Sequence, residues 1–520
     1  MKLFNSLKRN PIMIFIIGFF LFSCSDKISD DEIVAKVGDR IITASDFKIS
    51  FEFSFAPFRL GENPRETYLD YMIKELLIAN EGFTLGFNND RYVTSRATNR
   101  LNNNLLQSFY AKYVHSRVHV PDEAIEEATK KATIKFRMII WPLSTIDKAD
   151  AAYAEASETD LEDYVAKQIA KMEMPNVTNK TFETDWFDYL DLRPELLTEI
   201  QNLEMGKPSE PIPYKDGYAL YQVISINREP IKLEELKYGQ RRKRIKARLF
   251  NIEADKIVHK VMDSLLTPLD VKAKSKIVDL MVMPLYNWVR AGIPETGTIV
   301  ENLNAASDTS KSYILELKKL LPETLYTTVD GSYSVEDYFN YMNYHRKIIN
   351  LSTNPVNLKI RLLTEIGTMI KNNAFIDVAI EEDYKDSVRI VNDMQLWEQK
   401  WTYEVFREEL VKDITVSDEE MEIYFKDRWR ELPISQIDTT RFYKYKNDVY
   451  NAILFEKHSL ALESELVKLR EKYPVWINEE LLGSLELDDS QKSIETSLFV
   501  TKNFSGEKFI PDADMGWLHY

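Results

Sequence analysis

The segment from Thr133 to Trp141 reads TIKFRMIIW, and the segment from Tyr218 to Ile226 reads YALYQVISI. Short apolar runs of this kind, rich in β-branched and aromatic residues, are typical of buried strands. Two amphipathic helical patterns lie between them, at 147–173 and 193–203, and the stretch MGKPS at 205–209 predicts a turn. We therefore predict a β-α-α-β domain in this part of the chain.

Four short motifs in this domain match a known family. They are Asp185-Trp186-Phe187, where the family has Gly-Trp-Phe, then Pro194-Glu195, Leu203-x-x-Gly206-x-x-Ser209 and Gly217-Tyr218. In this order and spacing they resemble the parvulin-type peptidyl-prolyl isomerase domain. The resemblance implies a substrate pocket whose positions are filled here by Met138, Phe187, Leu192, Leu196, Tyr218 and Ala219.

The departures from the family concern its two histidines. Parvulins have His-Ile-Leu in the first strand and a histidine after Gly-Tyr in the last, where this chain has Met138 and Ala219, and no histidine occurs between residues 121 and 230. Prolyl isomerisation requires lowering a barrier of about 18–20 kcal/mol by favouring a twisted amide. An apolar groove without the histidine network still binds extended peptide, so we expect a degenerate pocket that is non-catalytic. A working isomerase with a rearranged site is the alternative.

A second pattern is an internal repeat. The motifs VGD (37–39), SDF (45–47), NP (63–64) and VPDE (120–123) recur in the same order as VDG (329–331), EDY (336–338), NP (354–355) and VSDE (416–419). The alternating stretch IVAKVGDRII at 33–42 predicts a hairpin, and Pro64 predicts the start of a helix. Four motifs in one order indicate a duplicated helical module.

Together with the parvulin-like domain, these modules resemble the SurA and PrsA family of cell-envelope foldases. The implied fold class is mainly α with an α+β insert, comprising two SurA-N-like helical modules and one parvulin-like β-α-α-β domain. The predicted boundaries are module 1 at 33–130, the degenerate parvulin-like domain at 131–230, a helical connector at 231–325, module 2 at 326–425, and a C-terminal helical region and tail at 426–520.

The chain begins like a bacterial lipoprotein. Lys2, Lys8 and Arg9 precede an apolar run at 12–22 that is too short for an ordinary membrane span. The residues LFSC end at Cys24, the only cysteine, and resemble a lipobox. We predict a signal peptide at residues 1–23, lipidation of Cys24, and a polar tether at 24–32. The alternatives are an ordinary secretory peptide with an incidental cysteine, or an uncleaved anchor.

Charge and cysteine content exclude several classes of function. The formal net charge is −16, and removing residues 1–23 takes away three positive charges and leaves −19. A chain this acidic is not held to nucleic acid by its overall field. With Cys24 lipidated, no thiol remains for a disulfide or a thiolate metal site. His115 and His119 lie four residues apart but have no third ligand in the sequence nearby, so we expect no metal and no cofactor.

Three other features have competing interpretations. Phe51, Phe53 and Phe55 alternate and are candidates for a client-binding strip, the alternative being core positions. The basic cluster at 241–248 indicates either a grip on phosphates or acidic partners, or a solvated helix face. The final residues, Trp517 to Tyr520, form an apolar end that is predicted to fray, the alternative being that it docks onto a partner.

The sequence therefore predicts a lipid-anchored chaperone at the outer membrane that faces the periplasm. It is expected to bind unfolded or assembling outer-membrane or secreted proteins, with membrane attachment through the lipid alone. Two alternatives stay open: an active parvulin-type isomerase, and a structural lipoprotein subunit of an outer-membrane barrel-assembly or secretion complex.

Overall fold

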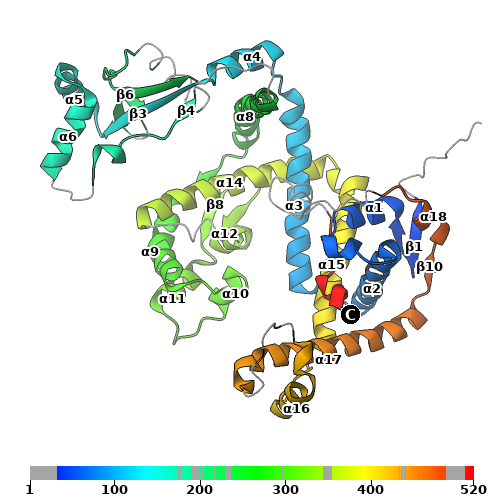
Figure 1. Cartoon of the computed structure of the whole chain (residues 1–520). Helices are drawn as coiled ribbons and strands as arrows, with labels where there is room; N and C mark the ends of the chain where they lie inside the picture. The colour runs from blue at the N-terminus through cyan, green and yellow to red at the C-terminus, as the bar shows by residue number, and fades with distance from the viewer. Residues whose placement is uncertain are drawn as a thin grey trace, which may run out of the picture. The chain divides into compact units, whose positions relative to one another are not determined.

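The computed structural model describes residues 32–172, 177–188, 191, 200, 203–214, 217–228, 236–294, 297–342, 354–432, 434, 437, 441–487 and 510–519 (Figure 1). The chain forms two compact units, one of residues up to Asn103 together with those from Lys385 onward, and one of Asn104–Tyr384. Cys24, the predicted signal peptide, and Leu192 and Leu196 of the predicted pocket lie outside the described residues.

A three-stranded sheet joins distant parts of the first unit. The predicted hairpin is present as β1 (Ile33–Val37) and β2 (Arg40–Thr43), with Gly38 at the turn in the left-handed region at φ +59°. Strand β10 (Val475–Ile477) pairs antiparallel with β1, giving the order β10-β1-β2. The C-terminal region therefore completes a sheet that begins at the N-terminal end.

Local signals fix the first two helices of this unit. Thr43 caps α1 (Ala44–Glu52): its hydroxyl oxygen accepts from the Asp46 N–H at 3.0 Å, and the Asp46 carboxylate accepts from the Thr43 N–H at 3.3 Å. Helix α2 (Pro64–Thr84) begins with proline, which lacks the N–H that would be unpaired there. Helix α3 (Arg91–Tyr113) follows and continues into the second unit.

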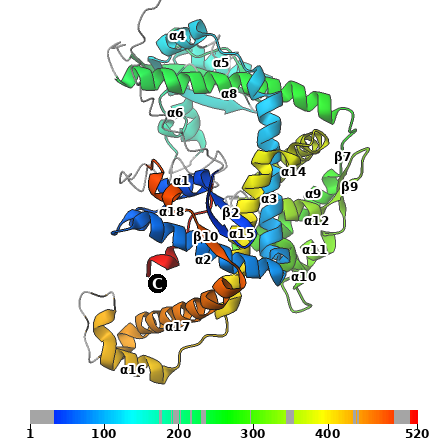
Figure 2. The same cartoon turned by 90° about the vertical axis from the view of Figure 1, so that its right-hand side faces the viewer.

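Four more helices lie in the described part of this unit: α15 (Val388–Val411), α16 (Asp418–Arg428), α17 (Phe442–Lys472) and α18 (Glu479–Ser484). Helix α16 packs against one end of α17 (Figure 2). Helices α2 and α15 approach closely at Gly82, where an added Cβ would lie 2.9 Å from Thr402 Cγ2. One core unites β1, β2, α1 and α2 with α15, α17, α18 and the end of the chain.

The end of the chain is not frayed. Trp517 is 1% exposed and lies in the core of the first unit, and Leu518 packs against the same core. The prediction of fraying is therefore wrong for these two residues, because the apolar side chains at the end have a complementary surface on distant helices.

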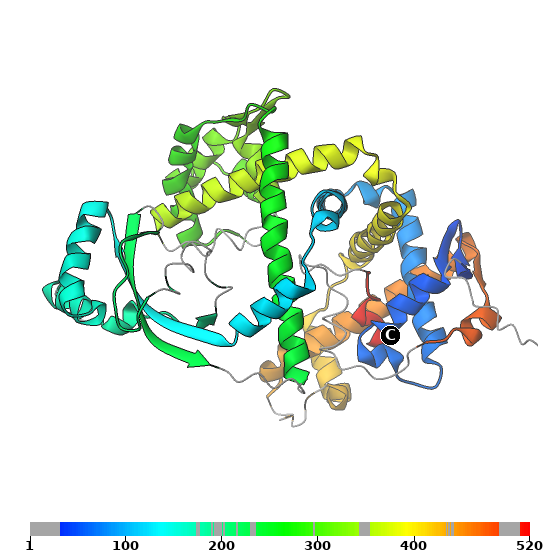
Figure 3. The ribbon, with the colours of Figure 1, turned by 90° about the horizontal axis from the view of Figure 1, so that it is seen from above.

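The insert of the second unit is a four-stranded antiparallel sheet in the order β4-β3-β6-β5. Its strands are β3 (Ile134–Leu143), β4 (Phe187–Asp188), β5 (Ile212–Tyr214) and β6 (Gly217–Arg228). Helices α5 (Ile146–Glu158) and α6 (Leu161–Met172) cover one face (Figure 3). The single pattern predicted at 147–173 is thus two helices, and the pattern at 193–203 lies mostly outside the described residues.

The start of α6 is held by β6. The Leu161 N–H, one of the helix's first donors, donates to Gln222 Oε1 at 2.6 Å. This bond fixes the break between α5 and α6.

Part of the second unit repeats the hairpin and the two helices that begin the first. Hairpin β8 (Thr324–Thr327) and β9 (Ser332–Ser334) leads to α12 (Val335–Met342) and α14 (Pro355–Glu381), as β1 and β2 lead to α1 and α2. Ser334 and Asp337 form the same reciprocal cap as Thr43 and Asp46, with bonds of 3.1 and 2.7 Å. Strand β7 (Lys272–Ala273) takes the place of β10 in the order β7-β8-β9.

The third strand of each sheet follows a helix of 31 residues, α8 (Leu236–Leu266) before β7 and α17 before β10. Among its described residues, the second unit also contains α4 (Asp122–Lys131), α9 (Ser275–Ala291), α10 (Ile299–Asn304) and α11 (Ser312–Leu320). The predicted fold class, mainly α with an α+β insert, is confirmed. We call β1, β2, α1 and α2 the first module, and β8, β9, α12 and α14 the second module.

Candidate functional site

The predicted isomerase pocket lies on the face of the insert sheet that α5 and α6 leave uncovered. Strands β3 and β6 pair so that Met138 is opposite Val223 and Pro142 is opposite Ala219. Residues opposite each other in an antiparallel pair share a face. The two positions where the family has histidine, Met138 and Ala219, therefore lie on one face of the sheet.

This face is closed and apolar. Met138 and Ala219 are each 0% exposed and belong to one cluster with Ile200, Tyr221 and Val223. Partly buried apolar side chains pack around it, among them Phe136, Ile140, Phe187, Leu203, Ile212 and Tyr214. In this conformation the histidine positions form part of a packed core.

The other described residues of the predicted pocket do not all lie on this face. Phe187 pairs with Phe136 and packs on the cluster of Met138. Tyr218 is opposite Leu143, so it lies on the face that α5 and α6 cover and not with Met138. The structure thus brings together Met138, Phe187 and Ala219, and it separates Tyr218 from them.

The Gly-x-x-Ser motif has a structural use. Gly206 is left-handed at φ +81°, and its N–H donates to the carbonyl of Val223 at 3.0 Å. Ser209 exchanges two bonds with Tyr221: the Ser209 N–H donates to the Tyr221 carbonyl at 2.7 Å, and Ser209 Oγ accepts from the Tyr221 N–H at 2.9 Å. The motif pins the preceding turn to β6, which accounts for its residues without catalysis.

The basic cluster of α8 takes part in ion pairs. Arg242 pairs with Asp122 of α4 at 2.7 Å, and Arg248 pairs with Asp188 of β4 at 3.0 Å and with Asp191 at 2.8 Å. These contacts attach α8 to its neighbours. They favour the structural interpretation of these two arginines over a phosphate grip.

The proposed aromatic strip of the first module is not exposed as a whole. Phe51 is buried, with its ring stacked 5.7 Å from Phe47 and edge-on to Tyr68 at 5.5 Å. The predicted exposure is therefore wrong for Phe51, because α1 turns it toward the core. Phe53 and Phe55 are half-buried and remain candidates for contact with a client.

An apolar stripe on α14 is a feature that the sequence patterns alone did not reveal. Val356, Ile360 and Leu363 are spaced by four and three residues, so they lie on one face of the helix, and they are 68%, 58% and 45% exposed. Their spacing was readable in the sequence. However, α14 also has a buried apolar face, at Leu358, Leu362, Ile366 and Met369, and a pattern alone does not say which face is covered.

The apolar stripe runs into a groove. The next position on the same face is Gly367, which lines a groove of about 610 Å³ between α14 and the end of α8. Its walls are Met262, Leu266, Thr267, Asp270, Val271, Thr364, Thr368, Ile370 and Lys371. Beside the stripe, Lys359 Nζ pairs with Asp279 Oδ1 of α9 at 2.6 Å, and α9 also exposes Leu280 and Met283. The surface is mainly apolar, with charges at its margin.

Metal ligands do not cluster in the described ranges, where no three His, Cys, Asp or Glu side chains lie close enough together to hold a metal ion. His115 instead packs its ring 5.4 Å from Phe250 of α8. No helix in the described part of the chain combines the length and hydropathy that crossing a bilayer requires.

No family model and no curated protein matches the chain. Among solved structures, a peptidylprolyl isomerase (PrsA) from Bacillus anthracis is 15% identical, with a TM-score of 0.21 over 31% of this chain and 69% of that one. PrsA from Bacillus cereus is 17% identical, with a TM-score of 0.23 over 47% and 95% of the two chains. One of two SurA-like chaperones of Campylobacter jejuni is 17% identical, with a TM-score of 0.23 over 47% and 100%. Scores this low do not establish membership of a family.

Proposed function

We propose that this protein is a chaperone of the bacterial cell envelope that holds unfolded or partly assembled proteins without turning them over. The observation that carries the proposal is the apolar stripe of α14 together with the groove of about 610 Å³ that continues it. Contiguous exposed apolar surface on a folded protein marks an interaction site. An unfolded client is a suitable partner for this surface, because it presents apolar side chains along an extended chain.

The dimensions suit an extended segment. From Val356 to Gly367 the helix rises about 16 Å at ~1.5 Å per residue. An extended chain covers that length with about five residues at ~3.3 Å each. Since alternate side chains share a face, such a segment would place two side chains on the stripe and one in the groove. The charges of Lys359, Asp270 and Lys371 at the margins would contact the client's polar groups.

The insert favours binding over isomerisation. Met138 and Ala219 fill the positions of the family's histidines and are packed into a core, so no polar network is present at these positions to act on a twisted amide. The insert would then serve as a rigid spacer. An active isomerase is the alternative, and a peptide assay distinguishes the two.

The location is part of the proposal. Lipidation of Cys24 would anchor the chain in the outer membrane, facing the periplasm, and would keep it near its clients at high local concentration. The lipobox at 21–24 supports this, and a Cys24→Ser chain is expected to fold normally and to leave the membrane fraction. A fixed place in a barrel-assembly or secretion complex would instead appear as stoichiometric co-purification without client.

The test of client holding uses the full mature chain and an unfolded outer-membrane β-barrel protein. Wild type is expected to delay aggregation measured by light scattering. Replacing Val356 and Ile360 by glutamate is expected to weaken capture about tenfold or more, on the order of 1.4 kcal/mol, because two apolar contacts are lost. Both side chains are more than half exposed, so the fold is expected to be unaffected.

The matched control lies on α17. Leu460 and Val467 are 67% and 63% exposed, but Glu463 and Ser464 separate them, so they form no continuous stripe. The same two glutamate substitutions there add the same charge and should leave capture unchanged. Equal losses in both variants would mean that charge, and not the stripe, governs capture. A wild type that neither delays aggregation nor binds client would exclude the chaperone function.

The isomerase alternative is tested in a protease-coupled assay with proline peptides. We expect no acceleration above the uncatalysed rate. Acceleration that disappears in Phe187→Ala, with the fold intact by circular dichroism, would establish catalysis in the cluster of Met138.

A further inference from the structure

The end of the chain occupies a built site on the first unit. The tail segment, residues 510–518, crosses α2 and α15, and its Trp517 is 1% exposed. The Trp517 ring lies 6.4 Å from that of Tyr71, with 12° between the planes, and 6.4 Å from that of Tyr403. The Lys74 ammonium lies 5.4 Å from the Trp517 ring. Aromatic rings and a cation therefore surround one indole.

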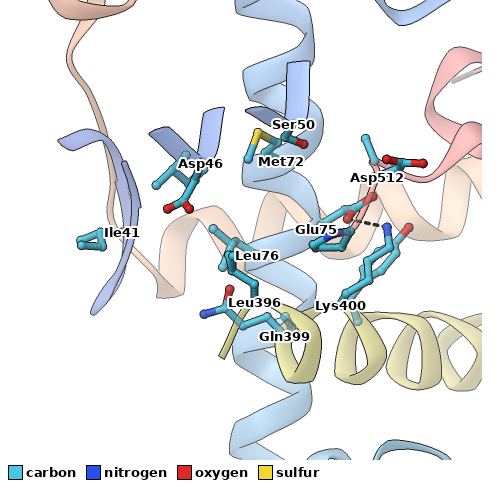
Figure 4. Close-up of a pocket in the computed structure, with 15 residues that line it drawn as sticks. Ile41, Asp46, Ser50, Met72, Glu75, Leu76, Leu396, Gln399, Lys400 and Asp512 are labelled. Carbon is cyan, nitrogen blue, oxygen red and sulfur yellow. Dashed lines mark hydrogen bonds and ion pairs between the residues drawn. The ribbon is translucent and has the colours of Figure 1, made fainter. Parts of the chain in front are cut away.

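A buried carboxylate binds this indole and the backbone beside it. Glu75 Oε1 accepts from Trp517 Nε1 at 3.1 Å and from the Asp514 N–H at 2.5 Å. Glu75 Oε2 pairs with Lys400 Nζ at 2.7 Å (Figure 4). Burial raises the pKa of the Glu75 carboxyl, and Lys400 opposes that rise. The acceptor is thus fixed in place by a cation and aimed at the tail.

The second anchor of the tail segment is Asp514. Its carboxylate accepts from the Tyr403 hydroxyl at 3.0 Å and pairs with Arg407 at 2.9 Å. Between the two anchors, Met515 is 56% exposed. The site therefore recognises an acidic residue and a tryptophan three positions later, and it makes little use of the residues between them.

The tail does not fill the site. A cavity of about 70 Å³ lies beside Asp512 and Ala513. It is lined by apolar side chains of β2, α2 and α15, which include Ile41, Met72 and Leu396, and by polar ones at its edge, which include Asp46, Ser50 and Gln399 (Figure 4). Three tail residues border this cavity: Pro511, Asp512 and the buried Ala513. A larger apolar side chain at the position of Ala513 would fill the cavity. The site is thus able to hold other sequences than the one it now holds.

The tail is also bound as a peptide ligand would be. It forms a short 3-10 turn at Met515–His519 and no strand pairing, and it is held by side chains and by a backbone N–H. The residues that bind the tail lie on α2 and α15, more than a hundred residues away along the chain. Recognition through two anchors and the backbone is the pattern of short linear motifs.

We propose that the site occupied by the tail segment is a second client-binding site, for client segments that form a turn with an acidic residue three positions before a tryptophan, as Asp514 and Trp517 do through the bond from the Trp517 N–H to the Asp514 carbonyl at 3.0 Å, and that the tail segment occupies it as an internal ligand. The proposal rests on the client-holding function proposed for this chain. A covalently attached ligand is present at about millimolar effective concentration, so free segments compete only when they bind more tightly or when the tail is weakened.

The experiment measures binding of a fluorescent peptide of residues 510–520 to the full mature chain by anisotropy. Wild type is expected to bind it weakly. The Trp517→Ala chain, which lacks its own indole anchor, is expected to bind it at least tenfold more tightly. A peptide carrying Trp517→Ala should bind neither chain, and a peptide carrying Ala513→Val should bind the variant chain several-fold more tightly than the parent peptide.

Because Trp517 is a core residue, its loss can unfold the chain. The Asp514→Ala chain is the second variant, since it vacates the other anchor while it leaves the core tryptophan in place, and the same gain is expected. Peptide affinity that is equal in wild type and both folded variants, or absent from all, overturns the proposal. If wild type forms a concentration-dependent dimer and the peptide dissociates it, the site binds a second copy of this chain. That result would overturn the assignment to clients.

Competition between the tail peptide and an unfolded client tests whether clients bind at this site. In a chain with Trp517→Ala or Asp514→Ala, the peptide is expected to release a fraction of the bound unfolded client. Adding Val356→Glu and Ile360→Glu to that chain should not change the amount of client that the peptide releases. Peptide binding without release of client overturns the client role of the site. If wild type captures no client at all, the proposed function fails, whereas the peptide affinities still report on the site itself.

Discussion

The two modules are built alike and differ in what lies against their second helix. Both have a hairpin, a reciprocal cap from a hydroxyl residue to an aspartate, and a proline-started helix. Against α2 lie α15 and the tail segment, with a buried carboxylate between them. Against the exposed face of α14 lies no described residue that buries Val356, Ile360 or Leu363.

Under the proposed function, this difference would let one scaffold serve two purposes. The first module is covered by the tail segment, whose Trp517 and Asp514 bind to Glu75, Tyr403 and Arg407. The second keeps an open apolar face, which we assign to clients. Substitutions at comparable places in the two units test this contrast, and the largest effect is expected at a buried ion pair.

The ion pairs of the two modules should differ most. Glu75→Leu is expected to lower the free energy of unfolding of the first unit by about 3–5 kcal/mol, because Lys400 and two N–H groups lose their buried acceptor. Asp279→Leu removes the partner of Lys359 in the second unit, where both side chains are about half exposed, and should cost about 0–1 kcal/mol. Unit-resolved hydrogen exchange measures both, and equal costs would contradict the buried role of Glu75.

The two helical glycines should respond in opposite directions. An added methyl at Gly82 would meet Thr402 and Phe406 of α15 at 2.9 and 3.1 Å, so Gly82→Ala should cost about 1–3 kcal/mol. Gly367 has nothing within 4 Å, and alanine is the better helix former, so Gly367→Ala should stabilise by about 0.5–1 kcal/mol. Chemical denaturation, monitored through the helix content, measures the change in the free energy of unfolding for each variant.

The stability of the first unit is expected to depend on pH through Glu75. The pKa of Glu75 is raised above its ordinary value of 4.5 by burial. The folded state therefore holds this proton more tightly than the unfolded chain does. The resulting contribution to stability is fully present below pH 4.5 and is lost as the pH rises through the raised pKa. Glu75→Gln cannot titrate, so the stability of wild type minus that of the variant should fall as the pH rises, and a rise would contradict the burial.

The caps should show no difference. Thr43→Ala and Ser334→Ala each remove a hydroxyl that accepts from the N–H three residues later, and each should cost about 1 kcal/mol in its own unit. Glycine at either position should cost only a few tenths. Costs that differ by more than the measurement error would mean that the two modules are less alike than their hydrogen bonds indicate.

Much of the fold follows from local pattern. The hairpin at 33–42, the proline-started helices and the strands β3 and β6 are encoded by residues within a few positions of one another. The pairing of β10 with β1, the burial of Trp517 and the bond between Lys400 and Glu75 join residues hundreds of positions apart. No periodicity reports such contacts, because each partner is an ordinary residue in its own segment.

The candidate sites followed the same rule. The resemblance to the parvulin domain predicted one pocket containing Met138, Phe187, Tyr218 and Ala219. It could not show that Tyr218 lies on the other face of β6, or that the face of Met138 and Ala219 is closed. The sequence placed Phe51 on a possible surface, where the core of α2 in fact covers it. The apolar stripe of α14 was present as a pattern, and only the fold shows which of the two apolar faces of that helix is open.

The most direct test of the central claim is photo-crosslinking from single positions of the full mature chain to an unfolded outer-membrane protein. A photoreactive phenylalanine analogue at Ile360 is expected to give client adducts in high yield, and the same analogue at the comparably exposed Leu460 of α17 to give few. Adducts that are absent from Ile360, or equal at the two positions, would contradict the assignment of the α14 stripe as the client-binding surface.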